Sequence, residues 1–150
     1  MKEVYNFLKE WAINFVKNKD IFIKTIIDIQ ERGREITIRH KHKEQKLFID
    51  PFLEHIDNDL KIINEDTDAS IICLNKEENL KTLIDKWAKL VIYKHLSIVF
   101  VNPFSEGQKY WAIFPYTHNK IADEQSLIQG LKTMFEQVEL IKDISVENTI

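Results

Sequence analysis

The spacing of hydrophobic positions changes several times along the chain, and each change predicts a new element. Residues 2–18 place apolar side chains three or four positions apart, which predicts an amphipathic helix. Residues 21–30 are rich in β-branched side chains, which favour a strand. Residues 36–42 alternate in a period of two, and Lys46–Ile49 follows as a third short strand. Because Gly33 supplies a tight reversal, the first half should form a helix and a three-stranded antiparallel meander.

The second half contains two apolar runs separated by a long amphipathic stretch. The runs Ser70–Leu74 and Leu96–Val101 read as strands, and the helix between them should begin at Asn75 and end near Tyr93. A strand, helix, strand unit predicts a parallel pair with a right-handed connection. A sixth strand is expected at Tyr110–Phe114.

Three further segments complete the prediction. A closing helix should occupy Ala122–Leu140, and Asp143–Ile150 has no clear period and should fray. Asp50 and Pro51 predict a helix cap and first residue, followed by a short helix over Phe52–Ile56.

Together these elements predict a single α/β domain over residues 1–150 with a mixed sheet. Its order is a helix, a three-stranded antiparallel meander, a parallel β-α-β crossover, a final hairpin strand and a closing helix. A two-layer α+β domain with a mostly antiparallel sheet is the alternative. A chain of 150 residues is long enough to bury roughly 68–70% of its extended surface without metals or disulfides.

Composition narrows the classes of function. Cys73 is the one cysteine, and its apolar surroundings predict a buried, inert thiol. The net charge of −3 argues against a whole-surface attraction to nucleic acid or to a membrane. The chain has no apolar run of the ~18–20 residues that would span a bilayer, so a cytoplasmic protein is expected. No phosphate loop, dinucleotide fingerprint or zinc-finger spacing is present, and no cofactor is expected.

The first candidate site is a basic surface on the meander. Its members are Arg32, Arg34, Arg39, Lys41, Lys43 and Lys46. Clustered cations attract phosphates or an acidic partner, which makes nucleic-acid binding possible in principle though not favoured. The alternative interpretation is a solvated strand face whose charge the acidic stretch Glu54–Asp68 neutralises within the fold.

The second candidate is the pair His40 and His42. Two residues apart on a strand, both imidazoles would point to one side and could share a metal ion. A catalytic metal needs a third protein ligand, and His55, Asp57, Asp59, His118 and Asp123 are available. The alternative is that both histidines lie on the solvated rim of the sheet.

The third candidate follows the sixth strand. A short polar segment there ends beside the expected start of the last helix, where an anion could bind. The ligand-binding candidates are Tyr116, Thr117, His118, Lys120 and Asp123. The alternative is ordinary turn and capping chemistry.

The fourth candidate is a nuclease site. Two acid-x-Lys triplets occur, Glu44-Gln45-Lys46 and Asp59-Leu60-Lys61. The order helix, meander, helix, strand resembles the restriction-endonuclease-like core. If Ser70–Leu74 were that core's third strand, it would lack the required Glu and Lys, and the chain would be a non-catalytic relative. The order of elements also resembles secretion-chaperone-like domains, which bind peptide segments and dimerise.

No reaction follows from these patterns. The leading hypothesis is a small binding or accessory domain that recognises a protein or peptide partner, and we expect a homodimer. Aromatic side chains, which often anchor interfaces, gather near the last hairpin at Phe104, Tyr110, Trp111 and Tyr116. The alternatives are a metal- or phosphate-dependent enzyme that uses His and Asp residues, and a nucleic-acid-binding protein.

Overall fold

The computed structural model describes residues 2–141, and the expected frayed tail at 143–150 lies outside this range. Its elements follow one another in the order α1 (Lys2–Asp20), β1 (Ile26–Arg32), β2 (Glu35–His40), β3 (Glu44–Ile49), α2 (Ile56–Ile62), β4 (Asp68–Leu74), α3 (Glu77–Asp85), α4 (Trp87–Leu90), β5 (Leu96–Val101), β6 (Tyr110–Ile113), α5 (Pro115–Ile121) and α6 (Glu124–Glu136). None of the helices in the described range is both long and apolar enough to cross a membrane.

The six strands form one open sheet in which each strand lies beside its predecessor in the sequence. The pairs β1–β2, β2–β3 and β5–β6 are antiparallel, as the hairpin patterns predict. The pair β4–β5 is parallel, which confirms the predicted crossover. The pair β3–β4 is parallel as well, so the sheet contains one more parallel pair than the sequence indicates. The predicted α/β class with a mixed sheet is therefore confirmed.

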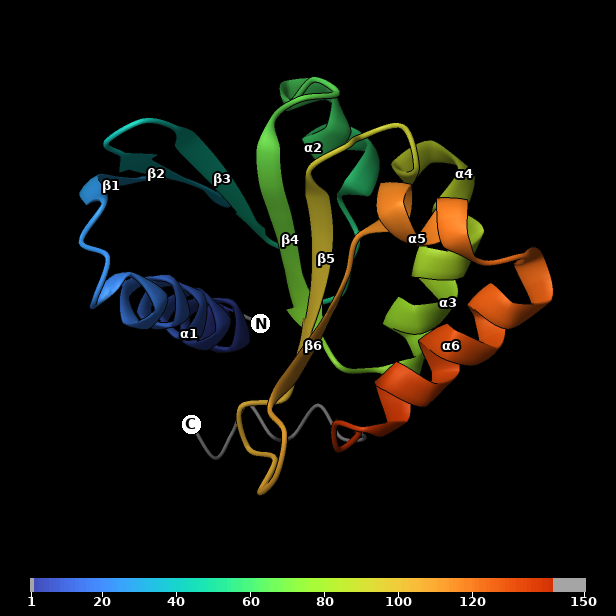
Figure 1. Cartoon of the computed structure of the whole chain (residues 1–150). Coiled ribbons are helices and arrows are strands. Elements are labelled where there is room, and N and C mark those ends of the chain that lie inside the picture. Colours follow the sequence, from blue (N-terminus) through green and yellow to red (C-terminus); the bar gives the residue numbers. More distant parts are fainter. Residues whose placement is uncertain (1, 142–150) are drawn as a thin grey trace.

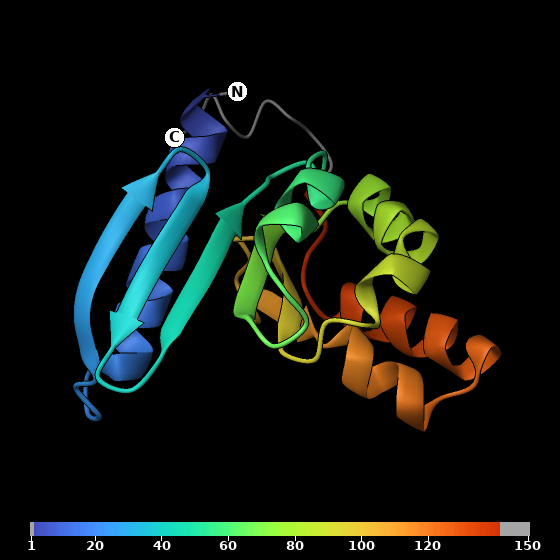
Figure 2. The same ribbon diagram turned by 90° about the horizontal axis from the view of Figure 1, so that it is seen from above.

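Helices cover the two faces of the sheet unequally. Helix α1 lies alone against one face, along the meander, and the other five helices lie on the opposite side of the sheet (Figures 1 and 2). Alternation in β2 and β3 explains this division, because Ile36, Ile38, Leu47 and Ile49 face α1 and form one core cluster with it. Strands β4 and β5 are apolar on both faces and contribute to both core clusters.

The junction between α1 and β1 differs from the prediction. The helix continues to Asp20, and the strand begins only at Ile26, not at residue 21. The carboxylate of Asp20 accepts hydrogen bonds from the backbone N–H groups of Thr25 and Ile26 and from the Thr25 hydroxyl, at 2.6–2.9 Å. Side chain–backbone bonding therefore holds a turn where β-branched composition alone favours a strand.

These bonds make part of the stability depend on pH. The Thr25 hydroxyl and the Ile26 amide lower the pKa of Asp20. A carboxyl whose pKa is depressed by folding stabilises the protein above its unfolded value of about 4, and this contribution is lost as the pH falls. Urea unfolding should therefore show Asp20→Asn to be less stable than the wild type at about pH 7, with the gap closing toward about pH 3. The exposed Glu10→Gln change serves as the control, and a gap independent of pH would contradict this origin.

Two predicted helix starts are wrong, because the side chains of Asp50 and Asn75 make other hydrogen bonds than those of a helix cap at the predicted position. Asp50 does not cap a helix at 52–56, because Leu53 adopts a left-handed backbone conformation (φ 51°) and α2 begins only at Ile56. Asn75 does not cap α3, whose cap residue is Lys76. The helix predicted to reach Tyr93 is also interrupted, since α3 ends at Asp85 and α4 begins at Trp87.

Asn75 instead joins three distant parts of the chain. Its side-chain N–H group donates to the carbonyls of Phe135, Val138 and Glu139, and its oxygen accepts from Trp111 Nε1 at 2.8 Å. Asn102, at the end of β5, likewise donates to the Glu139 carbonyl at 2.9 Å. Residues 135–139 are therefore held against the carboxyl ends of β4 and β5 by buried polar side chains.

Candidate functional site

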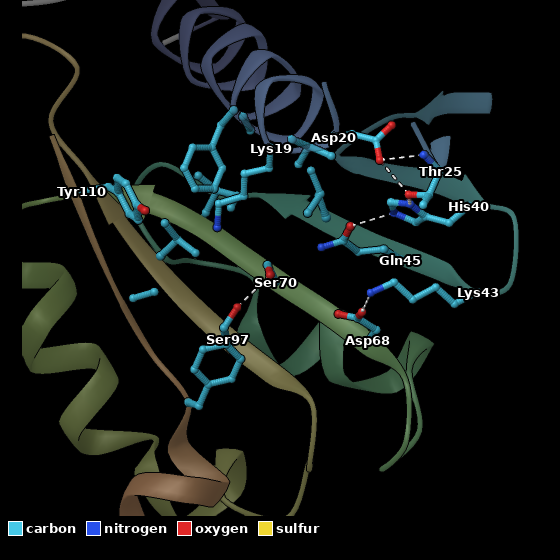
Figure 3. Close-up of a pocket in the computed structure, with 18 of the residues that line it drawn as sticks. Lys19, Asp20, Thr25, His40, Lys43, Gln45, Asp68, Ser70, Ser97 and Tyr110 are labelled. Carbon is cyan, nitrogen blue, oxygen red and sulfur yellow. Dashed lines mark hydrogen bonds and ion pairs between the residues drawn. The ribbon is translucent and has the colours of Figure 1, made fainter. Parts of the chain in front are cut away.

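A groove with mostly apolar walls lies on the α1 side of the sheet. It has a volume of about 560 Å³ and runs from the C-terminal end of α1 across β3, β4, β5 and β6 (Figure 3). Helix α1 contributes Phe15, Val16 and Lys19 to the lining, and Phe114, which directly follows β6, lines the groove as well. The combination of mostly apolar walls and a few polar groups is typical of a binding site.

Small side chains on neighbouring strands produce this groove. Ser70 on β4 is directly opposite Ser97 on β5, and their hydroxyl oxygens lie 2.7 Å apart. Ala112 is opposite Val99 in the next row. Each of these small residues occupies a position that points toward α1, where the next inward positions of β4 and β5 carry the larger side chains of Ile72 and Val99. These small side chains therefore leave a depression in this face of the sheet, and the end of α1 does not fill the space above it.

Polar side chains gather at the end of the groove nearest β2 and β3. The ring of His40 bonds the Thr25 hydroxyl at 2.9 Å and Gln45 Oε1 at 3.3 Å, and the Thr25 hydroxyl in turn donates to Asp20 (Figure 3). Lys43 Nζ pairs with Asp68 at 3.1 Å. A ligand in the groove would thus meet hydrogen-bonding groups at one end and apolar groups along the rest.

The groove extends to β6, which is an edge strand of the sheet. Within residues 2–141, β6 has a neighbouring strand on one side only. The N–H of Asn102 donates to the Lys109 carbonyl, so Lys109 faces β5, and by alternation the backbone groups of Tyr110 and Ala112 face outward. Gln108 Nε2 donates to the outward Tyr110 carbonyl at 2.8 Å. Strand β6 carries no charged residue, although charge is a common protection of edges.

An exposed apolar turn stands beside the same groove. Ile21, Phe22 and Ile23 connect α1 to β1, and Phe22 is 93% exposed. Ile23 is 69% exposed and lines the groove. Exposing three consecutive large apolar side chains is unfavourable in water unless a partner covers them.

The two histidines proposed as metal ligands occupy different structural settings. His40 lies at the end of β2 with its ring bonded as described, whereas His42 lies in the turn after the strand and is exposed. The strand geometry that would point both rings to one side therefore ends before His42. Within residues 2–141, the group of three His, Cys, Asp or Glu side chains that could hold a metal ion lies elsewhere, at Asp50, Glu54 and His55.

Most of the basic surface on the meander is paired with carboxylates. The ion pairs are Arg34–Asp59, Arg39–Asp28, Lys43–Asp68 and Lys46–Glu35. Two of the four acids belong to the acidic stretch 54–68, which thus neutralises part of this surface. The Arg34–Asp59 pair is bidentate, with bonds of 2.8 and 3.3 Å, and the Asp59 side chain is fully buried. Burial raises the pKa of Asp59, the bonds and charge of Arg34 lower it, and the charge of Asp50 raises it further.

The triplets considered for a nuclease do not form a group of metal ligands. Strand β3, not β4, is the third strand of the sheet, and it carries both Glu44 and Lys46. They border a polar hollow of about 530 Å³, but Lys46 Nζ occupies it as an ion-pair partner of Glu35 at 2.7 Å and of Glu44 at 3.9 Å. In the other triplet, the Asp59 carboxylate is occupied by Arg34.

The segment predicted as a polar loop after β6 is helix α5. His118 Nδ1 contacts the Phe114 carbonyl at 2.9 Å, and Lys120 Nζ donates to the Tyr116 hydroxyl at 2.7 Å. Asp123 caps α6 by accepting from the Ser126 amide, which agrees with the alternative interpretation of capping chemistry, and the helix spans Glu124–Glu136 where Ala122–Leu140 was expected. The candidate residues here, Thr117 among them, lie on a seven-residue helix and at the cap of the helix that follows it.

Cys73 is fully buried, and burial raises the pKa of its thiol well above the usual value, which agrees with an inert role. The groove contains His40 and Lys43 from the sequence candidates but also depends on Ser70, Ser97 and Ala112, which were not singled out. Their signal in the sequence is small side chains at inward positions of otherwise bulky strands.

The fold and groove define an α/β protein with an open, six-stranded mixed sheet and a partly uncovered face. Comparison with protein-family models, curated proteins and solved structures finds no match to this chain.

Proposed function

We propose that this chain is a binding module that holds an apolar segment of a protein partner in the groove between α1 and β6. The groove, with its floor of small side chains, is the observation that carries the proposal. Its walls are apolar, its polar groups are concentrated at one end, and α1 leaves it open. This arrangement suits a peptide better than a small charged substrate, because few charged groups face the apolar part.

The open edge of β6 suggests how the segment would be held. The backbone groups of Tyr110 and Ala112 face outward, where an extended peptide could add to the sheet by main-chain hydrogen bonds. Every second side chain of such a peptide would then point toward the groove face. We therefore infer that the partner binds as an extended strand with apolar residues at alternate positions.

Selection from a library of random peptides displayed on phage tests this proposal. The wild-type protein should select peptides with alternating apolar residues. Ala112→Arg, which places a long charged side chain in the groove, should weaken their binding at least about tenfold, since each 1.4 kcal/mol lost is a factor of ten. Phe114→Glu provides a second groove variant if the first is unstable.

The matched control is Ile121→Arg, which adds the same charge on the exposed side of α5. It should bind the selected peptides as tightly as the wild type does. Failure to select any peptide, or equal binding by the wild type and both groove variants, would contradict the proposal.

A second copy of the chain is the alternative occupant, and the exposed turn at 21–23 favours it. The turn borders the groove, so a twofold axis nearby would bring each turn against the other copy's groove in a single self-complementary interface. Light scattering after size exclusion should then give the mass of a dimer for the wild type and of a monomer for Phe22→Glu. A wild-type monomer at high concentration would remove this alternative.

A further inference from the structure

Asp50, Glu54 and His55 place three potential metal ligands at the carboxyl end of β3. One ligand atom from each residue lies within 4.8 Å of the others. The Asp50 side chain is almost fully buried, His55 is half-buried and Glu54 is exposed. The group therefore has a protein-lined inner side and an outer side accessible to water, as expected of a site that keeps an open coordination position.

The local backbone fixes the relative directions of these side chains. Oδ1 of Asp50 accepts the amide N–H of Glu54 at 3.0 Å, and Oδ2 accepts that of His55 at 2.8 Å. Leu53, which is buried, turns the chain through its left-handed conformation and lets residues 54 and 55 return to Asp50. The three ligands thus belong to one closed turn, which backbone hydrogen bonds of Asp50 and Pro51 also join to β4.

The charges around Asp50 favour an additional cation. Asp50 and Asp59 are both buried carboxylates, and the Arg34 guanidinium pairs with Asp59. Among the described residues, no Lys, Arg or His nitrogen lies within 4.0 Å of the Asp50 carboxylate in an ion pair. A buried carboxylate is costly unless a positive charge accompanies its hydrogen bonds, and the two amide bonds supply no net charge.

We propose that Asp50, Glu54 and His55 bind a divalent transition-metal ion, with Zn²⁺ as the best-suited ion. Two carboxylate oxygens and one imidazole nitrogen match the ligand preferences of Zn²⁺, with water in the fourth position. Mg²⁺ and Ca²⁺ prefer all-oxygen sites and suit the histidine less well. The site lies at the opposite end of β3 from Gln45 in the groove, so the proposal is independent of peptide binding.

Calorimetric titration of EDTA-treated full-length protein with ZnCl₂ tests the site. We expect one ion per chain in the wild type and at least a tenfold loss of affinity in both His55→Ala and Glu54→Gln. Thermal unfolding gives a second measurement. With Zn²⁺ at about one hundred times its Kd, Tm should rise by roughly 5–10 °C in the wild type and much less in the two variants. These variants retain the Asp50 carboxylate and its amide bonds, so the turn should still fold.

His42→Ala and Glu44→Gln are the matched controls, because they remove the same types of side chain from exposed positions of the meander. Both should bind Zn²⁺ like the wild type. The visible absorption bands of bound Co²⁺ should be lost in His55→Ala and Glu54→Gln. They should be retained in His42→Ala and Glu44→Gln. Absence of saturable binding, or binding that survives both His55→Ala and Glu54→Gln, would overturn the proposal. Loss of binding in His42→Ala alone would place the ion at the turn between β2 and β3, and this result would overturn the proposal as well.

Discussion

Replacing Asn75 with alanine is expected to lower the free energy of unfolding by about 3–5 kcal/mol. The side chain is fully buried and bonds Trp111 Nε1 and the carbonyls of residues 135, 138 and 139. Alanine would leave the indole N–H and at least one of these carbonyls without a partner, and each such buried group costs about 1–3 kcal/mol. The cavity left by the lost amide adds to this cost.

Urea unfolding followed by tryptophan fluorescence measures this loss. Asn14→Ala is the control, because Asn14 is exposed on α1 and alanine favours the helix, so its effect should stay within about 0.5 kcal/mol. Trp111→Phe removes the indole donor, and the double variant should therefore be less destabilised than the sum of the two single changes. Additive losses, or a loss below about 1 kcal/mol for Asn75→Ala, would show that the network is not coupled as described.

Replacing Arg34 with methionine is expected to cost about 3 kcal/mol at neutral pH, the lower end of the range for a broken buried pair. The Asp59 side chain is fully buried and would keep its charge without the bidentate guanidinium, whereas Arg34 itself is partly exposed. The double change Arg34→Met with Asp59→Leu removes both charges and should recover most of the loss.

The pH dependence gives an independent measurement of the same pair. Burial already raises the pKa of Asp59 in the wild type. Without Arg34 that pKa should rise further, so the folded variant takes up a proton as the pH falls and escapes the cost of a buried charge. Urea unfolding should thus show a smaller penalty for Arg34→Met at about pH 4 than at about pH 7. A penalty that stays constant or grows on acidification would contradict a role for the Asp59 charge.

Hydrophobic periodicity predicted the strands and the fold class, because it reports directly which side of an element is buried. The alternation around Ile36 and Ile38 and the apolar runs in β4 and β5 appear in the structure as expected. Two of the failures occurred where a polar side chain had more than one possible partner. Asp50 and Asn75 both have the residue types of helix caps, but one bonds a turn and the other bonds Trp111, and the distance between Asn75 and Trp111 is not encoded in local spacing.

The candidate sites were harder to predict than the fold. The charges of the basic surface on the meander could be recognised in the sequence. Their pairing with Asp59 and Asp68 depends on where α2 and β4 pack. The groove depends on three small residues from three strands, which become one surface only when the registers are known. His55 was among the available ligands, whereas its approach to Asp50 requires the left-handed conformation of Leu53.

The strictly sequential order of the sheet bears on how the chain acquires its structure. Since every strand pairs with the one made just before it, no strand has to be inserted between two that are already joined. The nascent chain can therefore extend a single growing edge as it leaves the ribosome, with α1 available from the start to cover the meander. Within residues 2–141 the last edge to be completed is β6, so growth of the described sheet ends at a strand that borders the groove.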